Sequence, residues 1–185
     1  MEPTDIMIMC SGNPNHATVA CAVAKIYPDA HFASRSNGYD LTFWTSGSED
    51  HFRNQIKKFT VFINSAFICG GGQLALLETT HEVWAKNNIK GHIINIGSSA
   101  EYIGVSDNRV NEDVYGIYSI QKRALRDRSL QLNGKKGIKT THITAGGLND
   151  GKPEHANYLE LDNLAQVIQW VIEHPNNITI IGIEK

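Results

Sequence analysis

The sequence has no long apolar run that could span a membrane or form the core of a signal peptide. No basic segment leads into an apolar one at the N-terminus, and the apolar stretch 6–10 is too short for either role. Cysteine is scarce: only Cys10, Cys21 and Cys69 occur, an odd number without CxxC spacing, as is usual for reduced intracellular thiols. We therefore expect a cytoplasmic protein whose cysteines are buried as small apolar residues.

An excess of one charge is also missing. The chain has 19 acidic and 17 basic residues and a formal net charge of -2, so no global field attracts nucleic acid or a membrane. One segment is locally basic through Lys122, Arg123, Arg126, Arg128, Lys135 and Lys136. A solvated helix face, or a surface for a partner helix, explains this segment more simply than nucleic-acid binding. We expect neither a nucleic-acid nor a membrane partner.

Metal-binding spacings and domain boundaries are absent as well. His81 and Glu82 begin like the zinc-protease pattern HExxH, but the fifth position is Ala85. No linker, repeat or low-complexity segment divides the 185 residues, which suit one domain with a substantial core. We therefore predict a single domain over 1–185 with no metal site.

Apolar stretches alternate with segments of helical spacing along the chain. The strand candidates are 6–10, 30–33, 39–44, 59–63, 92–96, 138–143 and 178–183. The helix candidates are 16–26, 46–58, 74–87, 118–132 and 161–172. This alternation predicts an α/β fold with a doubly wound parallel sheet and right-handed crossovers, and the near-continuous apolar strands agree with burial on both faces.

The chemistry of the chain is concentrated in Ser98, Tyr118 and Lys122. Ser98 follows a strand, and Tyr118 and Lys122 are four residues apart on a helix, so all three can face one reacting centre. A nearby ammonium lowers the pKa of a phenol from its usual value of about 10, which lets Tyr118 exchange a proton with a carbinol oxygen while Ser98 hydrogen-bonds that oxygen. Lys122 shares a partly apolar stripe with Leu125, where a purely solvated lysine is not expected. Taken singly, a serine after a strand is ordinary turn chemistry and the Tyr-Lys pair an ordinary helix surface.

The order of these residues resembles the short-chain dehydrogenase/reductase family. The stretch IINIGS at 93–98 matches the family's strand-end serine, and YSIQKRAL at 118–125 matches its YxxxK motif. The resemblance covers essentially the whole chain in shortened form and is firmest over 91–125. It implies a Rossmann-like domain and an NAD(P)-dependent oxidoreductase that interconverts a small-molecule carbonyl and an alcohol. Ser98, Tyr118 and Lys122 would be catalytic, with Tyr118 and Lys122 also touching the cofactor. Family members commonly form homo-oligomers through the helix that carries YxxxK and the helix next to it, so the resemblance implies a homo-oligomer.

The loop after the first strand can hold a phosphate on free backbone amides at a helix N-terminus. Its candidate cofactor residues are Ser11, Gly12, Asn13 and His16. The family's TGxxxGxG loop has its first glycine at Gly12, but the later glycines fall on His16 and Thr18. His16 either alters the backbone approach to the pyrophosphate or contacts a phosphate itself. A plain turn with Asn-Pro chemistry is the alternative.

Arg35, preceded by Ser34, follows the second strand, where an acidic residue would bind the ribose hydroxyls of NAD. A guanidinium there favours the 2'-phosphate of NADP, although a solvated surface arginine is equally common. The resemblance adds two turns beside the cofactor, formed by Asn64, Ser65, Ala66, Ala145 and Gly146. The asparagine that family members often keep in the helix after the fourth strand is not found, and Gln73 is the candidate to replace it.

A second class of function stays open: a non-catalytic dinucleotide-binding or sensor protein that retains the fold. The Ser-Tyr-Lys trio favours the enzyme, whereas His16 and Thr18 in the phosphate loop favour the sensor. We also expect the segment 101–114 to cover the site and 149–158 to be a short polar connection.

Overall fold

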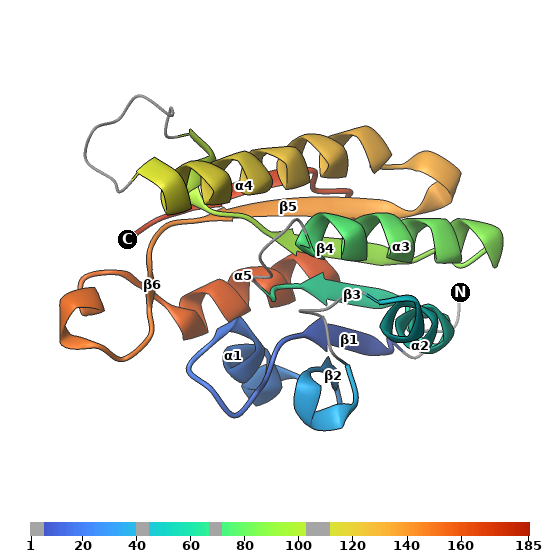
Figure 1. The fold of residues 1–185 in the computed structure, drawn as a ribbon, viewed down its shortest axis with the longest axis horizontal. Coiled ribbons are helices and arrows are strands. Elements are labelled where there is room, and N and C mark those ends of the chain that lie inside the picture. The colour runs from blue at the N-terminus through green and yellow to red at the C-terminus, as the bar shows by residue number, and fades with distance from the viewer. Residues whose placement is uncertain (1–5, 40–44, 67–71, 103–111) are drawn as a thin grey trace.

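The computed structural model describes residues 6–39, 45–66, 72–102 and 112–185, with the side chains of 112–115 excepted. Its centre is a parallel sheet of six strands, viewed in Figure 1. In spatial order the strands are β2 (His31–Ala33), β1 (Ile8–Ser11), β3 (Val61–Asn64), β4 (His92–Ile96), β5 (Lys139–Ala145) and β8 (Ile180–Ile183). The predicted doubly wound parallel α/β sheet in a single domain is thus confirmed.

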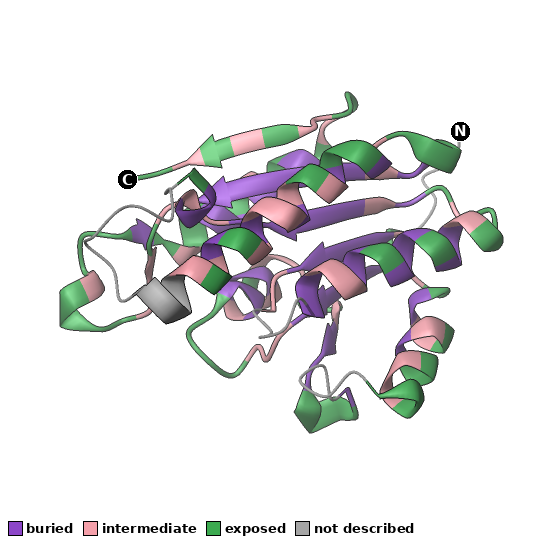
Figure 2. Cartoon of the chain, turned by 45° about the horizontal axis from the view of Figure 1, so that its top comes forward, coloured by how far each residue is buried: buried purple, intermediate pink, exposed green. Residues whose placement is uncertain are grey.

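Helices cover both faces of this sheet. They are α1 (Val19–Ile26), α2 (Ser46–Ile56), α3 (Gly72–Lys86), α4 (Glu112–Leu132) and α5 (Leu161–Glu173). Side chains of α1 and α5 pack into one apolar core and those of α2, α3 and α4 into another, on the opposite face. Figure 2 shows the buried strands between helices whose outer surfaces are exposed. In α5 the buried residues Leu164, Ala165, Ile168 and Val171 follow steps of three and one, the spacing of an amphipathic helix.

The register of the central strands aligns polar side chains near their carboxyl ends. Asn64 on β3 is opposite Asn95 on β4, and Asn95 is opposite His142 on β5. All three are fully buried. Parallel strands of otherwise apolar sequence therefore carry one polar row across the sheet, directly below the edge where such sheets bind ligands.

Four expectations about local structure are revised. The helix α1 begins at Val19 rather than His16, so that the residues from Gly12 to Thr18 form a longer loop. The helix with YxxxK begins at Glu112, and Glu101 lies in a short 3₁₀ helix, η2 (Ser99–Tyr102), rather than in an open loop. In the region expected as a plain polar connection, β6 (Leu148–Asn149) and β7 (Leu159–Glu160) pair as a small parallel sheet around the 3₁₀ helix Pro153–His155.

Other expectations concern residues that the structure describes only in part. Of the strand candidate 39–44, only Tyr39 is described; it is buried and its hydroxyl is 2.8 Å from His31 Nε2, while 40–44 lie outside the described residues. Cys10 is buried, which raises the pKa of its thiol to about 12, and Cys21 is half-buried; Cys69 also lies outside the described residues. Within the described part of the chain, no helix combines the length and apolar character needed to cross a membrane.

Candidate active site

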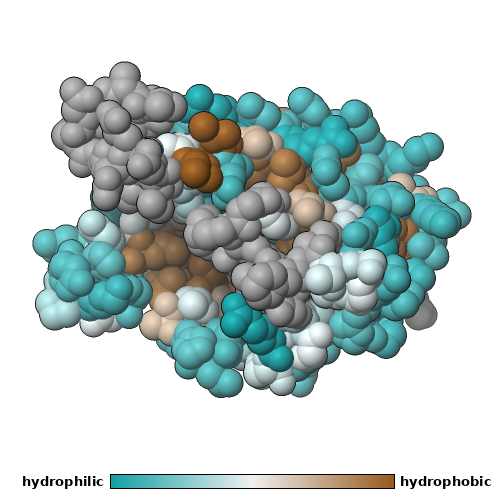
Figure 3. Space-filling view, in the orientation of Figure 1, coloured by the Kyte–Doolittle hydropathy of each residue, from teal (hydrophilic) through white to brown (hydrophobic). Residues whose placement is uncertain are grey.

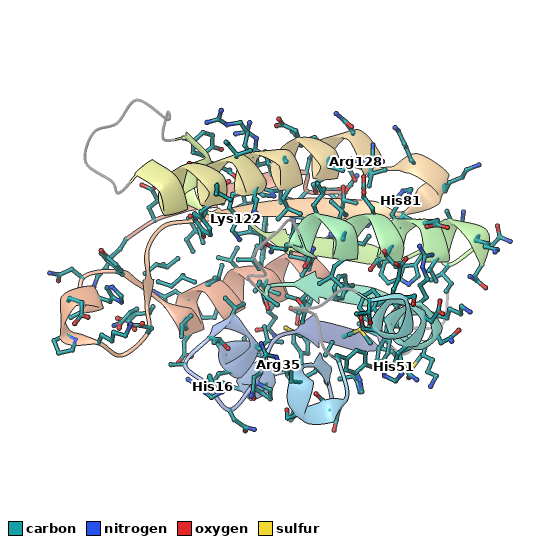
Figure 4. The ribbon with its side chains drawn as sticks, in the orientation of Figure 1. His16, Arg35, His51, His81, Lys122 and Arg128 are labelled. Atoms are coloured by element: carbon teal, nitrogen blue, oxygen red, sulfur yellow. The ribbon has the colours of Figure 1, made fainter. Side chains whose placement is uncertain are left out.

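Lys122 is the central residue of the candidate site. It projects from the middle of α4 (Figure 4), and only 5% of it is exposed. Its ammonium donates to Gln73 Oε1 over 2.9 Å and to the carbonyl oxygen of Ile96, the last residue of β4, also over 2.9 Å. Burial lowers the pKa of Lys122 to about 8, and the negative charge of Glu101 opposes that fall. The expectation that Lys122 is not a solvated lysine is confirmed.

Gln73 links this lysine to the polar row of the sheet. Its amide nitrogen donates to the carbonyl oxygens of Asn64 and Ile96 at 2.7 and 2.9 Å. Asn64 Nδ2 donates back to the Gln73 carbonyl and to Asn95 Oδ1, and Asn95 Nδ2 donates to Ser129 Oγ on α4. This network spans β3, β4, α3 and α4. Gln73, the candidate from the sequence to replace the missing asparagine of this helix, therefore provides an acceptor for the Lys122 ammonium.

Tyr118 lies next to Lys122, and Ser98 follows the end of β4 that the Lys122 ammonium contacts. The Lys122 ammonium is 5.5 Å from the centre of the half-buried Tyr118 ring, one helical turn away. Ser98 is half-buried at the end of the turn after β4, and its hydroxyl oxygen accepts from the Ala100 amide at 3.2 Å. The helix and the strand end thus bring all three proposed catalytic residues to the same edge of the sheet.

The loop after β1 has the features of a phosphate site. Gly12 has a φ of +132°, and a Cβ there would lie 3.1 Å from Ala20 Cβ on α1, so only glycine fits. Thr18 precedes α1 but does not cap it; its hydroxyl donates instead to the carbonyl oxygens of Asn13 and His16. The first amides of α1 thus keep no side-chain acceptor from their N-cap, the arrangement that a pyrophosphate needs. The described residues therefore fit a dinucleotide.

The other side chains of this loop divide into two kinds. Ser11 is fully buried, and its oxygen accepts from the amides of Ser65 and Ala66 at 2.9 and 3.0 Å. Ser65 returns a bond to the Ser11 carbonyl oxygen. Ser11 therefore ties the loop to the turn after β3, whereas Asn13 is half-buried and His16 is exposed on the loop (Figure 4).

The end of β2 presents Arg35 at the surface. Ser34 is buried, and its hydroxyl bonds to Ser36 Oγ at 2.8 Å and Asn37 Oδ1 at 2.5 Å. The side chain of Arg35, the next residue, is exposed on the loop beyond β2 (Figure 4). The Gly12 amide donates to the Ala33 carbonyl at 3.0 Å, which holds the phosphate loop beside this strand end. Ser34 thus shapes the turn and Arg35 is the residue that can reach a ligand.

The turn after β5 completes the edge. Ala145 is buried, and the Gly146 amide donates to the Ile183 carbonyl at 2.9 Å. A cavity of about 240 Å³ opens beside this turn. Its lining consists of Ser99, Gly146, Gly147, Asn157, Tyr158, Leu159, Glu184 and Lys185. Figure 3 shows a hollow with hydrophobic atoms beyond the strand ends.

The sequence motifs did not point to one buried group at the site, the carboxylate of Glu101. Glu101, three residues after Ser98, contacts His142 and Thr144 of β5 inside the protein. Two features of the sequence could have indicated this contact. An acidic residue follows shortly after the strand-end serine, and a histidine lies inside an otherwise buried strand. Among the described residues no group of three His, Cys, Asp or Glu side chains could hold a metal ion.

The architecture is shared with many solved dehydrogenases. A 4-hydroxyisoleucine dehydrogenase complexed with NADH superposes with a TM-score of 0.72 at 18% identity, covering 97% of each chain. A short-chain dehydrogenase from Leptospira borgpetersenii serovar Hardjo-bovis with bound NAD+ gives 0.73 at 15% identity, covering 98% of this chain and 92% of that one. An alcohol dehydrogenase from the archaeon Thermococcus sibiricus complexed with 5-hydroxy-NADP gives 0.71 at 11% identity, covering 97% of each.

Comparison of the sequence, in contrast, finds no relatives. No protein-family model matches the chain, and no curated protein matches it significantly. The chain nevertheless has the fold of the short-chain dehydrogenases/reductases, as the strand-end serine and YxxxK predicted. At identities of 11–18% the likeness concerns the fold, and the chemistry must be argued from the side chains.

Proposed function

We propose that this protein is an NADP-dependent oxidoreductase that interconverts a small-molecule carbonyl compound and an alcohol. The observation that carries the proposal is Lys122: a buried ammonium, fixed by Gln73 and the β4 carboxyl end, beside Tyr118. Burying a lysine ammonium costs free energy, which hydrogen bonds only partly offset. Buried ionisable groups of this kind are frequent in active sites, so the position of Lys122 beside a phenol supports a catalytic role.

The roles follow from the donor and acceptor groups. Tyr118 passes a proton to or from the substrate oxygen, and the Ser98 hydroxyl hydrogen-bonds that oxygen while its charge changes. The Lys122 ammonium stabilises the phenolate form of Tyr118. Two of its N–H groups are held by Gln73 and Ile96, and we assign the third to the ribose of the cofactor.

The cofactor fits the edge of the sheet. The amides at the start of α1 and the close approach at Gly12 would hold the pyrophosphate, and Arg35 would hold the 2'-phosphate. The nicotinamide, when bound, accepts or supplies the hydride. The solved structures of this fold include complexes with NADH and with NADPH, so the choice of NADP depends on Arg35.

The test is turnover by Tyr118→Phe. Wild-type protein is assayed with NADPH and NADH against a panel of aldehydes and ketones, and in the reverse direction against alcohols. The variant should lose at least about 100-fold in kcat but keep its affinity for NADPH, because only the transferable proton is removed. Tyr27→Phe, which removes a hydroxyl at the C-terminal end of α1, at the sheet edge opposite the candidate site, is the matched control and should change neither. Unchanged turnover in Tyr118→Phe would end the catalytic assignment.

A non-catalytic dinucleotide sensor is the second candidate. It is favoured by the phosphate loop, where side chains at His16 and Thr18 replace the glycines that allow close approach to the pyrophosphate. Tight binding of NADPH without turnover of any substrate in the panel would support this second function.

A further inference from the structure

Glu101 is a fully buried carboxylate that the roles above do not use. Its side chain has no exposed surface, and it lies three residues after Ser98. His142 Nε2 is 2.9 Å from its Oε2, and the Thr144 hydroxyl donates to its Oε1 at 2.5 Å. A buried carboxylate is expensive and an apolar residue could fill the same space, so its presence calls for a reason.

The segment that carries Ser98 is held on both sides at this point. The Glu101 amide donates to the Ser98 carbonyl at 3.0 Å, and its own carbonyl accepts from Arg123 Nε on α4 at 3.1 Å. The Ala100 carbonyl accepts from Ser119 Oγ, also on α4. The carboxylate provides the attachment to β5. The turn from Ser98 to Glu101 is thus clamped between α4 and β5, and Glu101 closes the clamp.

Gly97 shows how closely β5 approaches this turn. A Cβ on Gly97 would lie 2.2 Å from His142 Nε2 and 3.2 Å from Glu101 Oε2, so the glycine makes room for the pair. The carboxylate can only accept, so His142 Nε2 carries the proton of their hydrogen bond. His142 Nδ1 is buried without a hydrogen-bond partner among the described residues, and a proton there would be an unpaired buried donor. The His142 ring therefore attaches the Glu101 carboxylate to β5 through Nε2.

Besides His142 on β5, cationic side chains of α4 interact with Glu101. The charge of Glu101 acts on Lys122 and on Arg126. Burial alone would raise the pKa of Glu101, but the hydrogen bonds from His142 and Thr144 and the charges around it outweigh burial and hold that pKa below its ordinary value. Glu101 therefore stays ionised at neutral pH, and its charge acts on a lysine whose own burial favours loss of its proton.

We propose that Glu101 is a positioning residue of the active site, which fixes the turn carrying Ser98 and supplies the buried counter-charge of Lys122. The inference rests on the proposed function, because Ser98 and Lys122 receive their catalytic roles there. If Glu101 only held the turn in place, its hydrogen bonds would be needed but its negative charge would not. Variants that remove either the charge or one hydrogen bond distinguish the two roles.

The experiment compares Glu101→Gln with Thr144→Val. Glu101→Gln keeps the shape and removes the charge, whereas Thr144→Val removes one bond of the clamp and keeps the charge. Glu78→Gln, which removes an exposed carboxylate paired with Arg128 on the outer surface of α3 and α4, is the matched control. The ionisation of Lys122 is followed by NMR of lysine labelled with ¹³C at the ε carbon, with the signal assigned through Lys122→Met. Thermal melting and kcat are measured alongside.

In Glu101→Gln we expect the titration midpoint of Lys122 to fall by about one pH unit, because the nearby negative charge is lost. We expect kcat to fall about tenfold, with NADPH affinity unchanged, because Ser98 loses its fixed position. Thr144→Val should lower kcat by a smaller factor and leave the Lys122 midpoint unchanged, and Glu78→Gln should change neither quantity.

A Lys122 midpoint in Glu101→Gln within about 0.2 units of wild type would overturn the counter-charge, because removing a buried charge that acts on Lys122 must shift that midpoint. If Glu101→Gln does not fold, Thr144→Val decides the positioning role, and full kcat in that variant would overturn it. The titration needs no turnover. If wild-type protein turns over no substrate, the proposed function fails, whereas the Lys122 midpoint still decides whether Glu101 is its counter-charge.

Discussion

Gln73 and Lys122 meet below the carboxyl end of β4, where the lysine ammonium donates to Gln73 Oε1 over 2.9 Å. The residues are 49 positions apart, on α3 and α4, and both are buried. A neutral amide here provides an acceptor for the ammonium without a full negative charge. Gln73 also satisfies the carbonyl oxygens of Asn64 and Ile96, so that one side chain connects three elements of the site.

Gln73→Leu should destabilise the protein by about 3 kcal/mol, because it removes the partners of several buried polar groups at once. Urea unfolding at pH 7 measures this difference. Gln166→Leu, at an exposed position of α5, is the control and should change the free energy of unfolding by less than about 0.5 kcal/mol. A Gln73→Leu variant as stable as the control would show that the network contributes little to folding.

Lys122→Met should change how stability depends on pH. The pKa of Lys122 is 10.5 in its ordinary state and about 8 in the fold, so between these values the unfolded chain binds a proton that the folded chain does not. The free energy of unfolding of the wild type therefore rises with pH between about 8 and 10.5. Below pH 8 the folded protein carries the full cost of burying the charged ammonium. Methionine has no such charge.

The stability of Lys122→Met relative to wild type should accordingly fall by about 2 kcal/mol between pH 7 and pH 10. Unfolding by urea at several pH values gives this difference, in which other titrating groups cancel. Lys86→Met, at an exposed position of α3, should show no trend. A parallel pH dependence in wild type and Lys122→Met would mean that the ammonium is not shifted by burial.

The outer face of α4 should form a subunit contact. Ile117 and Ile120 are 60% and 55% exposed although they are apolar and one turn apart. Figure 3 shows hydrophobic atoms over the first half of this helix. Replacing both with serine should convert a homo-oligomer into a monomer in sedimentation at micromolar concentration. Trp170→Ser, which removes an exposed apolar side chain from α5 on the opposite face, should leave the oligomer intact. A wild-type monomer at that concentration would refute the contact.

Patterns local in sequence predicted much of the site, because they depend on strand ends and helix spacing. Ser98, Tyr118 and Lys122 could be proposed from one strand and one helix, and the apolar stripe with Leu125 indicated that Lys122 is not a purely solvated lysine, in agreement with its burial. Gln73 could be proposed as a substitute, but its bond to Lys122 depends on how α3 packs against α4.

The contacts of Glu101 could not be predicted in this way. Its partner His142 is 41 residues away, and the two meet only because β4 and β5 pair in a particular register. The small sheet of β6 and β7 was missed for a similar reason, since two residues per strand give no periodic signal. Pairing between distant segments, rather than local propensity, determined each of these features.

The cofactor preference provides the last prediction: NADPH should bind more tightly than NADH, and more weakly than to relatives with an intact glycine loop. Arg35 is exposed at the end of β2, where its guanidinium can form a charge-assisted contact with a 2'-phosphate. The side chain at His16 should hinder the backbone approach to the pyrophosphate, and a hydrogen bond from its imidazole to a phosphate would offset part of that loss.

Fluorescence titration with both dinucleotides measures this preference. Arg35→Ala should reduce NADPH affinity about tenfold and leave NADH affinity within about twofold, because only NADPH carries the 2'-phosphate.

His16→Gly should increase the affinity for both dinucleotides if crowding dominates and decrease both affinities if the imidazole binds a phosphate. Lys86→Ala, which removes a positive charge from α3, controls for general electrostatic attraction and should change neither affinity. Equal affinities in the wild type, or an unchanged preference in Arg35→Ala, would remove Arg35 from cofactor selection. If neither dinucleotide binds at millimolar concentration, the Ser-Tyr-Lys trio has no cofactor to work with.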